Sequence, residues 1–441
     1  MATLNMEQPS STLPAQRQQY LTDLFLKVGH LCYACLKVFI DQWEDLPESS
    51  DLDLLVEKKE IPEWKGLLVD APYISRISWQ ETSCACYVHV FFEDGGFLEI
   101  DLIFKCKWKQ WVFFRPKEAI KQAFDHGIGL KSATREDSFL YMALFYGLNG
   151  LGVPEKYRGI FSTLNKIEQS QLQEQVEKRY QIKLASPEAL LDLSTYKGEI
   201  LDQLSRWKEN RGMRRLGNRW SYYRDAFRRR KPTLTFSGVD GAGKSTILYK
   251  TKELLETKYR LNVRVLRQRP SLLPILSSYK YGKAEAEVRA ARTLPRQGTN
   301  KSTFSSLLRF LYYYLDYFFG QWWIEWTVNR RGTLLLYDRY YFDYVADSKR
   351  ANIILPRWFM RALFAGVFKP EINIVLYASP EIILARKKEL SAADILTLTQ
   401  AYQDLFVRLT QKYPKKRFLL IKNIELEDTM HQIEQSLREI I

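Results

Sequence analysis

The sequence predicts an α/β protein in which an α+β domain precedes a five-stranded parallel sheet. From Pro232 onward, short β-branched or aromatic strands alternate with helical stretches of ten or more residues, as in sheets whose strands are joined by helical crossovers. Before that point, two apolar strands are joined by a tight turn and followed by helical patterns. The two halves are therefore expected to fold as different kinds of domain.

Composition and charge indicate a large folded protein with an anionic partner. The chain has 441 residues, 14% of them aromatic, and a net charge of +15. Such an excess suits nucleotide phosphates, nucleic acid or an acidic membrane surface, although part of it is ordinary solvated surface. Residues 1–16 lack a secretory pattern and predict a disordered tail, and the five cysteines are an odd number. We therefore expect a reducing, cytoplasmic compartment.

An aromatic run at residues 310–328 has the length of a membrane span. It contains Asp316, Gln321 and Glu325, and it is rich in aromatic residues rather than leucine. Charged residues are costly inside a bilayer. We therefore expect a buried helix here and no transmembrane segment.

Residues 17–205 predict an α+β domain with a helical extension. Residues 17–44 have the apolar spacing of a long helix. The stretch CACYVHVFFEDGGFLEIDLIFK, residues 84–105, predicts two strands joined by an Asp-Gly-Gly turn. Helical patterns follow from about residue 116 to residue 205.

Three carboxylates of this domain predict a metal site. Asp51 and Asp53 are two positions apart on a predicted strand, and hence on one face, while Asp101 lies on a second strand. Carboxylates on adjacent strands can hold two Mg²⁺ ions for nucleotidyl transfer. Alternatively, they form the acidic solvent face of a half-exposed strand.

The pattern D-x-D with a later Asp resembles the nucleotidyltransferase superfamily. The superfamily's Gly-Ser turn before the first strand is replaced here by DLPESS, residues 45–50. The resemblance implies a nucleotidyltransferase-like domain that is either active or degenerate. A degenerate domain would bind a nucleotide or a sugar phosphate without catalysis.

Residues 206–231 form a strongly basic segment between the two domains. Eleven Lys or Arg stand against Glu209 and Asp225, and aromatic residues are interleaved with them. This composition fits an amphipathic segment that contacts an anionic membrane or nucleic acid. It fits equally a linker helix that rests on the neighbouring domain, so both interpretations stay open.

The stretch GVDGAGKS, residues 238–245, fits the P-loop pattern G-x-x-x-x-G-K-[ST] between a predicted strand and a predicted helix. Its glycines let backbone amides point at phosphate oxygens, and the helix N-terminus adds partial positive charge. Lys244 is expected to reach the β- and γ-phosphates of ATP, and Ser245 to bind Mg²⁺. The expected ATP-binding residues are Gly238, Gly241, Gly243, Lys244, Ser245 and Thr246.

A second motif, GTLLLYDRYYFDY at residues 332–344, follows an apolar strand. A carboxylate at the end of such a strand, here Asp338, can hold the Mg²⁺ shell, and the adjacent Arg339 can take the phosphate of the acceptor. A surface ion pair is the alternative, but the buried strand favours a sheet edge that faces the cleft.

Together, FSGVDGAGKST, YDRYYFDYVA and SPEIILARKK resemble thymidylate kinases and their relatives among nucleoside monophosphate kinases. The resemblance covers residues 232–441. It implies a P-loop NTPase fold that transfers the γ-phosphoryl of ATP to an acceptor phosphate, by default dTMP, with Mg²⁺. It also implies a possible homodimer through the long aromatic helix.

The resemblance assigns roles to individual residues. Asp240 would order the catalytic centre and Arg386 would neutralise transition-state charge, beside the roles of Lys244, Asp338 and Arg339. The residues expected on the acceptor side are Arg269, Tyr340 and Asp343.

The chain departs from the family on the acceptor side. The family reads the pyrimidine with an arginine inside the long helix, whereas here Arg309 lies at the helix start and Asp316 with aromatic residues occupies the expected region. Without that guanidinium, a pocket loses much of its discrimination. The acceptor is therefore a nucleoside monophosphate or another phosphorylated or hydroxyl molecule, such as a sugar of a surface polysaccharide. An ATP-binding regulatory or scaffold protein and a nucleic-acid-binding protein are the alternatives of other classes.

Overall fold

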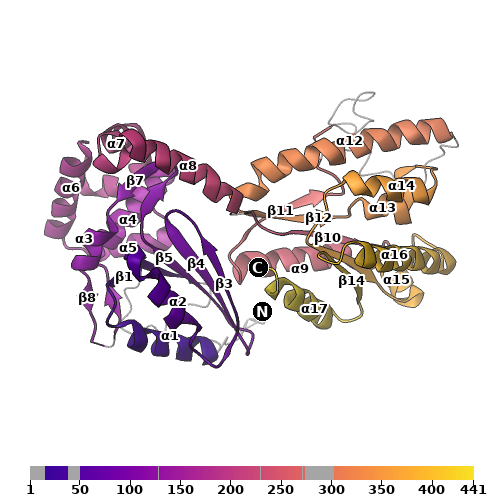
Figure 1. Ribbon diagram of the computed structural model, residues 1–441, viewed down its shortest axis with the longest axis horizontal. Coiled ribbons are helices and arrows are strands. Elements are labelled where there is room, and N and C mark those ends of the chain that lie inside the picture. The colour runs from indigo at the N-terminus through magenta and orange to yellow at the C-terminus, as the bar shows by residue number, and fades with distance from the viewer. Residues whose placement is uncertain (1–14, 38–49, 128, 229, 271, 274–301) are drawn as a thin grey trace, which may run out of the picture. The chain divides into compact units, whose positions relative to one another are not determined.

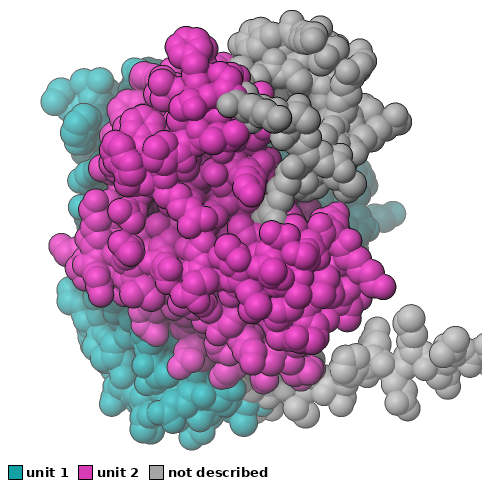
Figure 2. All heavy atoms as spheres, turned by 90° about the vertical axis from the view of Figure 1, so that its right-hand side faces the viewer, with its two compact units in different colours: residues 1–228 teal, residues 229–441 magenta. Residues whose placement is uncertain are grey.

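The computed structural model describes residues 15–37, 50–127, 129–228, 230–270, 272–273 and 302–441. The chain forms two compact units, residues 1–228 and residues 229–441, which are coloured separately in Figure 2. Most of the expected tail, residues 1–14, lies outside the described residues, and Ala15 begins the first helix. The basic segment 206–231 contains the boundary between the two units.

The described part of the first unit contains a seven-stranded sheet of order β3-β4-β5-β2-β1-β9-β8 (Figure 1). The predicted hairpin is confirmed, because β4 and β5 pair antiparallel from Ala85↔Ile103 to Phe91↔Phe97. A separate two-stranded sheet consists of β6 and β7. The strands are β1 (Tyr33–Leu36), β2 (Leu52–Val56), β3 (Ile74–Glu81), β4 (Ala85–Phe92), β5 (Phe97–Ile103), β6 (Cys106–Trp108), β7 (Trp111–Phe114), β8 (Phe124–Asp125) and β9 (Lys131–Ser132).

Helices cover both faces of this sheet. Leu54 of β2 packs in one core with Leu24 and Trp64 of the first two helices, whereas its neighbour Leu55 packs in the other core with Phe139. This alternation is the strand period of two. The helices are α1 (Ala15–Val28), α2 (Ile61–Val69), α3 (Pro116–Lys121), α4 (Arg135–Leu148), α5 (Glu155–Thr163), α6 (Lys166–Tyr180), α7 (Lys197–Ser205) and α8 (Gly212–Arg228).

The long helix predicted at residues 17–44 is wrong. Helix α1 ends at Val28, and β1 begins at Tyr33 with all four of its residues buried. Gly29 marks the break, since a Cβ there would lie 3.1 Å from the Cα of Gly129. The central place of β1 in the sheet thus overrides the helical spacing.

The second unit contains a five-stranded, wholly parallel sheet of order β11-β12-β10-β13-β14. The predicted five-stranded parallel sheet is confirmed. Its strands are β10 (Thr233–Gly238), β11 (Asn262–Arg267), β12 (Thr333–Asp338), β13 (Ile372–Tyr377) and β14 (Arg417–Lys422). The helices described between and after them are α9 (Lys244–Thr257), α12 (Thr303–Thr327), α13 (Phe342–Ala346), α14 (Arg357–Leu363), α15 (Pro380–Arg386), α16 (Ala392–Lys412) and α17 (Leu426–Arg438). Because the strands are parallel, their carboxyl ends share one edge, where ligands of open α/β sheets bind.

The long aromatic helix α12 is buried on one face only. Phe310, Tyr317 and Ile324 pack in the core of the second unit. The expectation of a buried helix thus holds for one side, because the aromatic residues continue around the helix. The large exposed side chains are Phe304, Leu308, Leu311, Leu315, Phe318, Phe319, Trp322, Trp323 and Trp326. Across the described ranges, no helix combines the length and apolarity that crossing a membrane requires.

Candidate phosphate-binding site

Three glycines give the loop after β10 a shape that other residues cannot adopt. Gly238, Gly241 and Gly243 have φ values of 132°, 87° and 86°. A Cβ at Gly238 would lie 2.2 Å from the carbonyl oxygen of Leu376, and one at Gly243 would lie 2.3 Å from Nδ2 of Asn423. Glycine is therefore required both by conformation and by space.

The loop leads into the N-terminus of α9. Gly243 is the N-cap and offers no side-chain hydrogen bond to the first turn. Ser245 and Thr246 are exposed in that turn. The first amides of a helix have no partner inside the helix, so this turn can bind an anion.

Lys244, the first residue of α9, is buried under the loop. Its Nζ donates to the carbonyl oxygen of Val239 at 2.7 Å and lies 3.8 Å from Oδ1 of Asp240. Burial lowers the pKa of Lys244 to about 7, and the charge of Arg339 acts in the same direction. Lys244 thus loses its proton more readily than an exposed lysine, and a bound anion would favour the protonated form.

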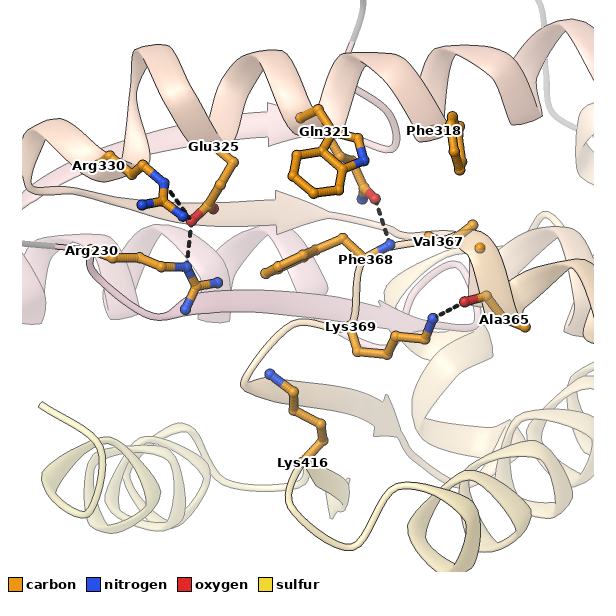
Figure 3. Close-up of a pocket in the computed structure, with 12 residues that line it drawn as sticks. Arg230, Phe318, Gln321, Glu325, Arg330, Ala365, Val367, Phe368, Lys369 and Lys416 are labelled. Atoms are coloured by element: carbon orange, nitrogen blue, oxygen red, sulfur yellow. Dashed lines mark hydrogen bonds and ion pairs between the residues drawn. The ribbon is translucent and has the colours of Figure 1, made fainter. Parts of the chain in front are cut away.

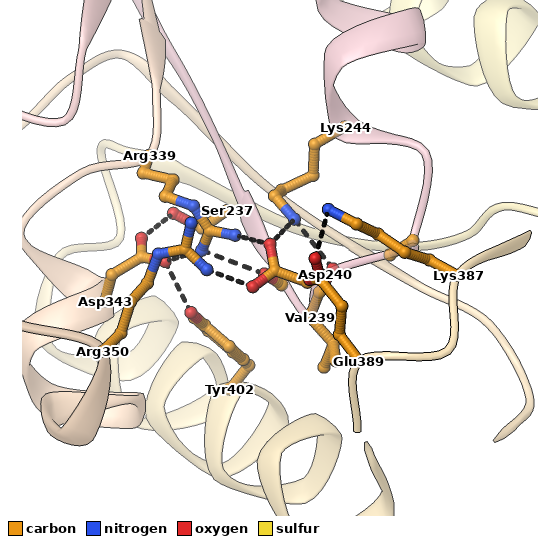
Figure 4. Close-up of polar contacts among 12 residues, drawn as sticks. Ser237, Val239, Asp240, Lys244, Arg339, Asp343, Arg350, Lys387, Glu389 and Tyr402 are labelled. Atoms are coloured by element: carbon orange, nitrogen blue, oxygen red, sulfur yellow. Dashed lines mark hydrogen bonds and ion pairs between the residues drawn. The ribbon is translucent and has the colours of Figure 1, made fainter. Parts of the chain in front are cut away.

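The carboxylate of Asp240 forms ion pairs with two guanidinium groups (Figure 4). Arg339 donates to Oδ1 of Asp240, and Arg350 of the short 3₁₀ helix η7 (Ser348–Ala351) donates to Oδ2. Burial raises the pKa of Asp240, but the charges of Arg339, Lys244 and Arg350 outweigh burial and hold the pKa at about 2. The carboxylate therefore stays ionised and fixes both arginines.

Arg339 is itself held between two carboxylates. Its Nη1 donates to Oδ1 of Asp343 at 2.5 Å, and its backbone N–H donates to Phe236 at 2.8 Å. Its φ of 73° is unusual for a residue with a side chain. Such a conformation persists only where surrounding contacts enforce it.

Asp343 supports Arg339 and does not face an open space. It is 1% exposed, and its carboxylate also accepts from Tyr402 Oη at 2.6 Å and from Ser237 Oγ at 2.8 Å. In this conformation the carboxylate of Asp343 is bonded to Arg339, Tyr402 and Ser237, and its expected contact with a substrate stays a prediction.

Asp338 and Arg386 lie near the loop on different elements. Asp338 ends β12 opposite Phe236 of β10, and it is partly exposed. Arg386 ends α15; its Nη1 donates to the carbonyl oxygen of Asn423 at 3.3 Å and would lie 3.6 Å from a Cβ at Gly243. The structure thus places Arg386 against the P-loop.

No family model and no curated protein matches this chain. Among solved structures, the thymidylate kinase from Ehrlichia chaffeensis is similar to part of it. The likeness has a TM-score of 0.31 and 16% sequence identity, and it covers 47% of this chain and 98% of that one. A likeness at this level assigns neither substrate nor activity to the chain.

Arg269 and Tyr340, expected on the acceptor side, are both engaged elsewhere. Arg269 Nη1 donates to Oδ2 of Asp316 at 2.9 Å, so the acidic residue that interrupts the aromatic helix is neutralised by a buried partner. Tyr340 is fully buried and donates its hydroxyl to the carbonyl oxygen of Phe368 at 2.7 Å. In this conformation Tyr340 forms part of the core and does not line the loop.

The carboxylates of the first unit come together only in part. Asp53 of β2 and Asp101 of β5 are register partners on neighbouring parallel strands, and Asp51 immediately precedes β2. Lys37 forms an ion pair with Asp53. Within the described ranges, no three His, Cys, Asp or Glu side chains are grouped so as to hold a metal ion.

Asp101 is a carboxylate with a buried oxygen. Its Oδ1 has no hydrogen-bond partner among the residues that the structure describes. Burial raises the pKa of Asp101 well above its usual value, and the negative charges of Asp53, Glu99 and Asp51 raise it further. A carboxylate in this state gains from a proton or a cation.

A separate cavity of about 440 Å³ lies in the second unit (Figure 3). It is bordered by Arg230, Arg330 and Lys416, which precede β10, β12 and β14. Arg230 donates to Glu325, and Lys416 donates to Glu371 at 2.8 Å. The cavity thus lies at the amino ends of the strands and is distinct from the P-loop site.

Sequence reasoning missed Arg350, Tyr402 and Asn423. Asn423 follows β14, donates Nδ2 to the carbonyl oxygen of Ala242 at 2.8 Å and accepts from Thr429 at 3.0 Å, so it fastens the loop from outside. A polar residue directly after the predicted strand was an available signal for Asn423. Arg350 and Tyr402 had no comparable signal, because neither lies in a recognised motif or directly after a predicted strand.

Proposed function

We propose that residues 232–441 form an ATP- and Mg²⁺-dependent phosphotransferase of the thymidylate kinase type. The observation that carries this proposal is the buried Lys244 inside a loop of three obligatory glycines, beside the Arg339–Asp240–Arg350 cluster. Transfer of a phosphoryl group requires that the group be positioned and that its negative charge be neutralised. The lysine, the helix N-terminus and the arginines beside the loop can do both.

The donor side follows from the loop. Lys244 would contact the β- and γ-phosphates, and the amides of the loop with Ser245 and Thr246 would surround the rest of the triphosphate. Ser245 and Asp338 offer the hydroxyl and carboxylate oxygens that Mg²⁺ prefers, and the ion would neutralise charge between phosphates. Arg386, at the rim of the loop, would stabilise the charge of the transition state.

The acceptor side favours a phosphate but not a particular base. Arg339 and Arg350 lie beside the loop, and Asp240 orients both of their guanidinium groups. Arg269 is committed to Asp316. A nucleoside monophosphate, with dTMP as the family default, is therefore the first acceptor to test, and a sugar or sugar phosphate is the alternative.

The test is ADP release by the full chain with Mg-ATP and single acceptors: dTMP, other nucleoside monophosphates, simple sugars and sugar phosphates. Lys244→Ala is the inactive variant, and Lys250→Ala, an exposed lysine on the same helix, is its matched control. Turnover that disappears only in Lys244→Ala supports the proposal and names the acceptor. ATP binding without turnover on any acceptor contradicts it and favours a regulatory or scaffold role.

For the first unit, we propose a nucleotidyltransferase-like site in which Asp53 and Asp101 hold a divalent cation. The unpartnered, buried Oδ1 of Asp101 supports this assignment. Electron paramagnetic resonance of bound Mn²⁺ in the nucleotide-free full chain tests it. We expect Asp101→Asn to remove one bound ion, with exposed Asp202→Asn as control. An unchanged number of bound ions contradicts the assignment.

We also propose that the exposed face of α12 pairs two copies of the chain. Its large exposed apolar side chains recur along the helix from Phe304 to Trp326, and such a patch on a protein surface marks an interaction site. The isologous pairing of one helix with its copy is the simplest closed arrangement.

A further inference from the structure

Helix α8 packs its polar side against the rest of the first unit. Asn218 accepts from Lys105 at 2.7 Å, and Asp225 accepts from the backbone N–H of Ser83 at 2.9 Å. Asn218 and Asp225 are each 4% exposed. A helix that packs on a domain normally buries its apolar side, so α8 is inverted.

The opposite side of α8 carries an apolar stripe that faces solvent. Its members follow one another at spacings of three, four, three and four residues, which places them on one helix face. Met213 and Trp220 are 81% and 72% exposed. This outer stripe consists of Met213, Leu216, Trp220, Tyr223 and Phe227.

Arginines border the outer stripe. Arg219 lies one turn before Tyr223 and Arg224 lies one turn after Trp220, so one arginine stands on each side of the stripe. Asp225 is the single acidic residue in the sequence of α8; it accepts from Ser83 and lies 3.8 Å from Arg224, so the other arginines of the helix have no acidic neighbour within α8. The helix therefore presents to solvent an apolar stripe with positive charge on both sides. Its exposed arginines are Arg214, Arg215, Arg219, Arg224 and Arg228.

We propose that α8 docks the chain on the surface of a bilayer that contains acidic lipids. The outer stripe would lie at the boundary between headgroups and acyl chains, and the arginines would contact lipid phosphates and carboxylates. Single-stranded nucleic acid fits less well, because Met213 and Leu216 cannot stack with bases as aromatic side chains do. The helix lies on the membrane and does not cross it.

Co-sedimentation of the full chain with large unilamellar vesicles tests the proposal. One set of vesicles is pure phosphatidylcholine, and the other contains phosphatidylserine at about three parts in ten. We expect at least about tenfold stronger binding to the acidic vesicles, and a marked loss of binding when NaCl is raised, since screening weakens attraction to acidic lipids.

Two double variants separate the apolar and charged contributions. Trp220→Gln with Phe227→Gln should weaken binding about tenfold or more, since both side chains would leave the acyl boundary. Arg219→Gln with Arg224→Gln should abolish the preference for acidic lipid. Trp358→Gln, an exposed tryptophan of α14, is the matched control and should bind as the unmodified chain does. Circular dichroism and thermal unfolding establish that each variant is folded.

Three outcomes would overturn the proposal. The first is no binding of the folded chain to acidic vesicles, as expected if the outer stripe is covered. The second is equal loss of binding in the stripe variant and in Trp358→Gln. The third is a chain that does not bind vesicles but does bind a single-stranded oligonucleotide, and that loses the oligonucleotide in the Arg219→Gln, Arg224→Gln variant. That result would assign the surface to nucleic acid.

Discussion

The guanidinium group of Arg339 lies against the carboxylate of Asp240 and joins the end of β12 to the glycine-rich loop after β10. The two residues are 99 positions apart in the sequence. Since Asp343 holds the other side of Arg339, the guanidinium is fixed before any ligand binds. Preorganised charge of this kind is the main catalytic resource of phosphoryl transfer.

Arg339→Lys should be nearly as damaging as Arg339→Ala. An ammonium group cannot donate to Asp240 and Asp343 in the two directions that a guanidinium fork reaches. We expect kcat/KM to fall about 10²–10³-fold in both variants, with ATP affinity nearly unchanged. Arg361→Lys, an exposed residue of α14, is the control. A lysine variant that keeps most of the activity would show that charge alone suffices at this position.

The Asp240 carboxylate should make stability depend on acidic pH. Its pKa of about 2 lies below the usual value near 3.9, so its stabilising contribution is present above pH 4 and is lost as pH falls toward 2. The contribution at neutral pH is about 2 kcal/mol. Denaturant unfolding of Asp240→Asn at pH 7, 4 and 2.5 should show lower stability at pH 7 and a shallower decline below pH 4. Exposed Asp202→Asn should behave as the unmodified chain.

ATP binding should take up a proton above neutral pH. Lys244 has a pKa of about 7 in the free protein, and triphosphate beside it favours the charged ammonium, so the bound form holds its proton at higher pH. Affinity should then fall with rising pH above 7, by up to roughly tenfold per pH unit. Calorimetry at pH 8 in buffers of different ionisation enthalpy measures the uptake. Proton uptake that persists in Lys244→Ala would place the titrating group elsewhere.

Charged substitutions on α12 should separate the proposed dimer. Trp323→Glu introduces a carboxylate into the exposed apolar row, where pairing would bury it at high cost. Sedimentation velocity should show a dimer for the unmodified chain and a monomer for the variant, while Trp358→Glu stays dimeric. An unmodified chain that is monomeric at all concentrations would remove this surface from consideration.

Local signals in the sequence were sufficient for the frame of the second unit. In the strands that end in Gly238 and Asp338, the apolar pattern of the strand is directly followed by the motif. The structure has both strands at the predicted positions. Contacts between residues that are far apart in the sequence could not be predicted from such local signals. Tyr402 reaches Asp343 from α16, and nothing in its own neighbourhood indicates the contact.

The same limit explains the errors. The spacing of residues 17–44 is helical, but burial of β1 on both faces decides the outcome beyond Val28. The substrate contact expected of Asp343 stays a prediction, but its bonds from Tyr402 and Ser237 come from distant parts of the chain and had no local signal. The alternation of the strands indicated which residues share a face, whereas the register that sets Asp53 beside Asp101 on parallel neighbours was established only by the structure.

The bond from Asn423 to Ala242 has a consequence for biosynthesis. The P-loop is made early in the second unit, but the side chain that fastens it belongs to the segment after the last strand, 181 residues later. During synthesis on the ribosome, the glycine-rich loop would therefore remain without this bond until the segment after β14 has been made. The shape of a loop at the start of the second unit thus depends on the last strand of its parallel sheet.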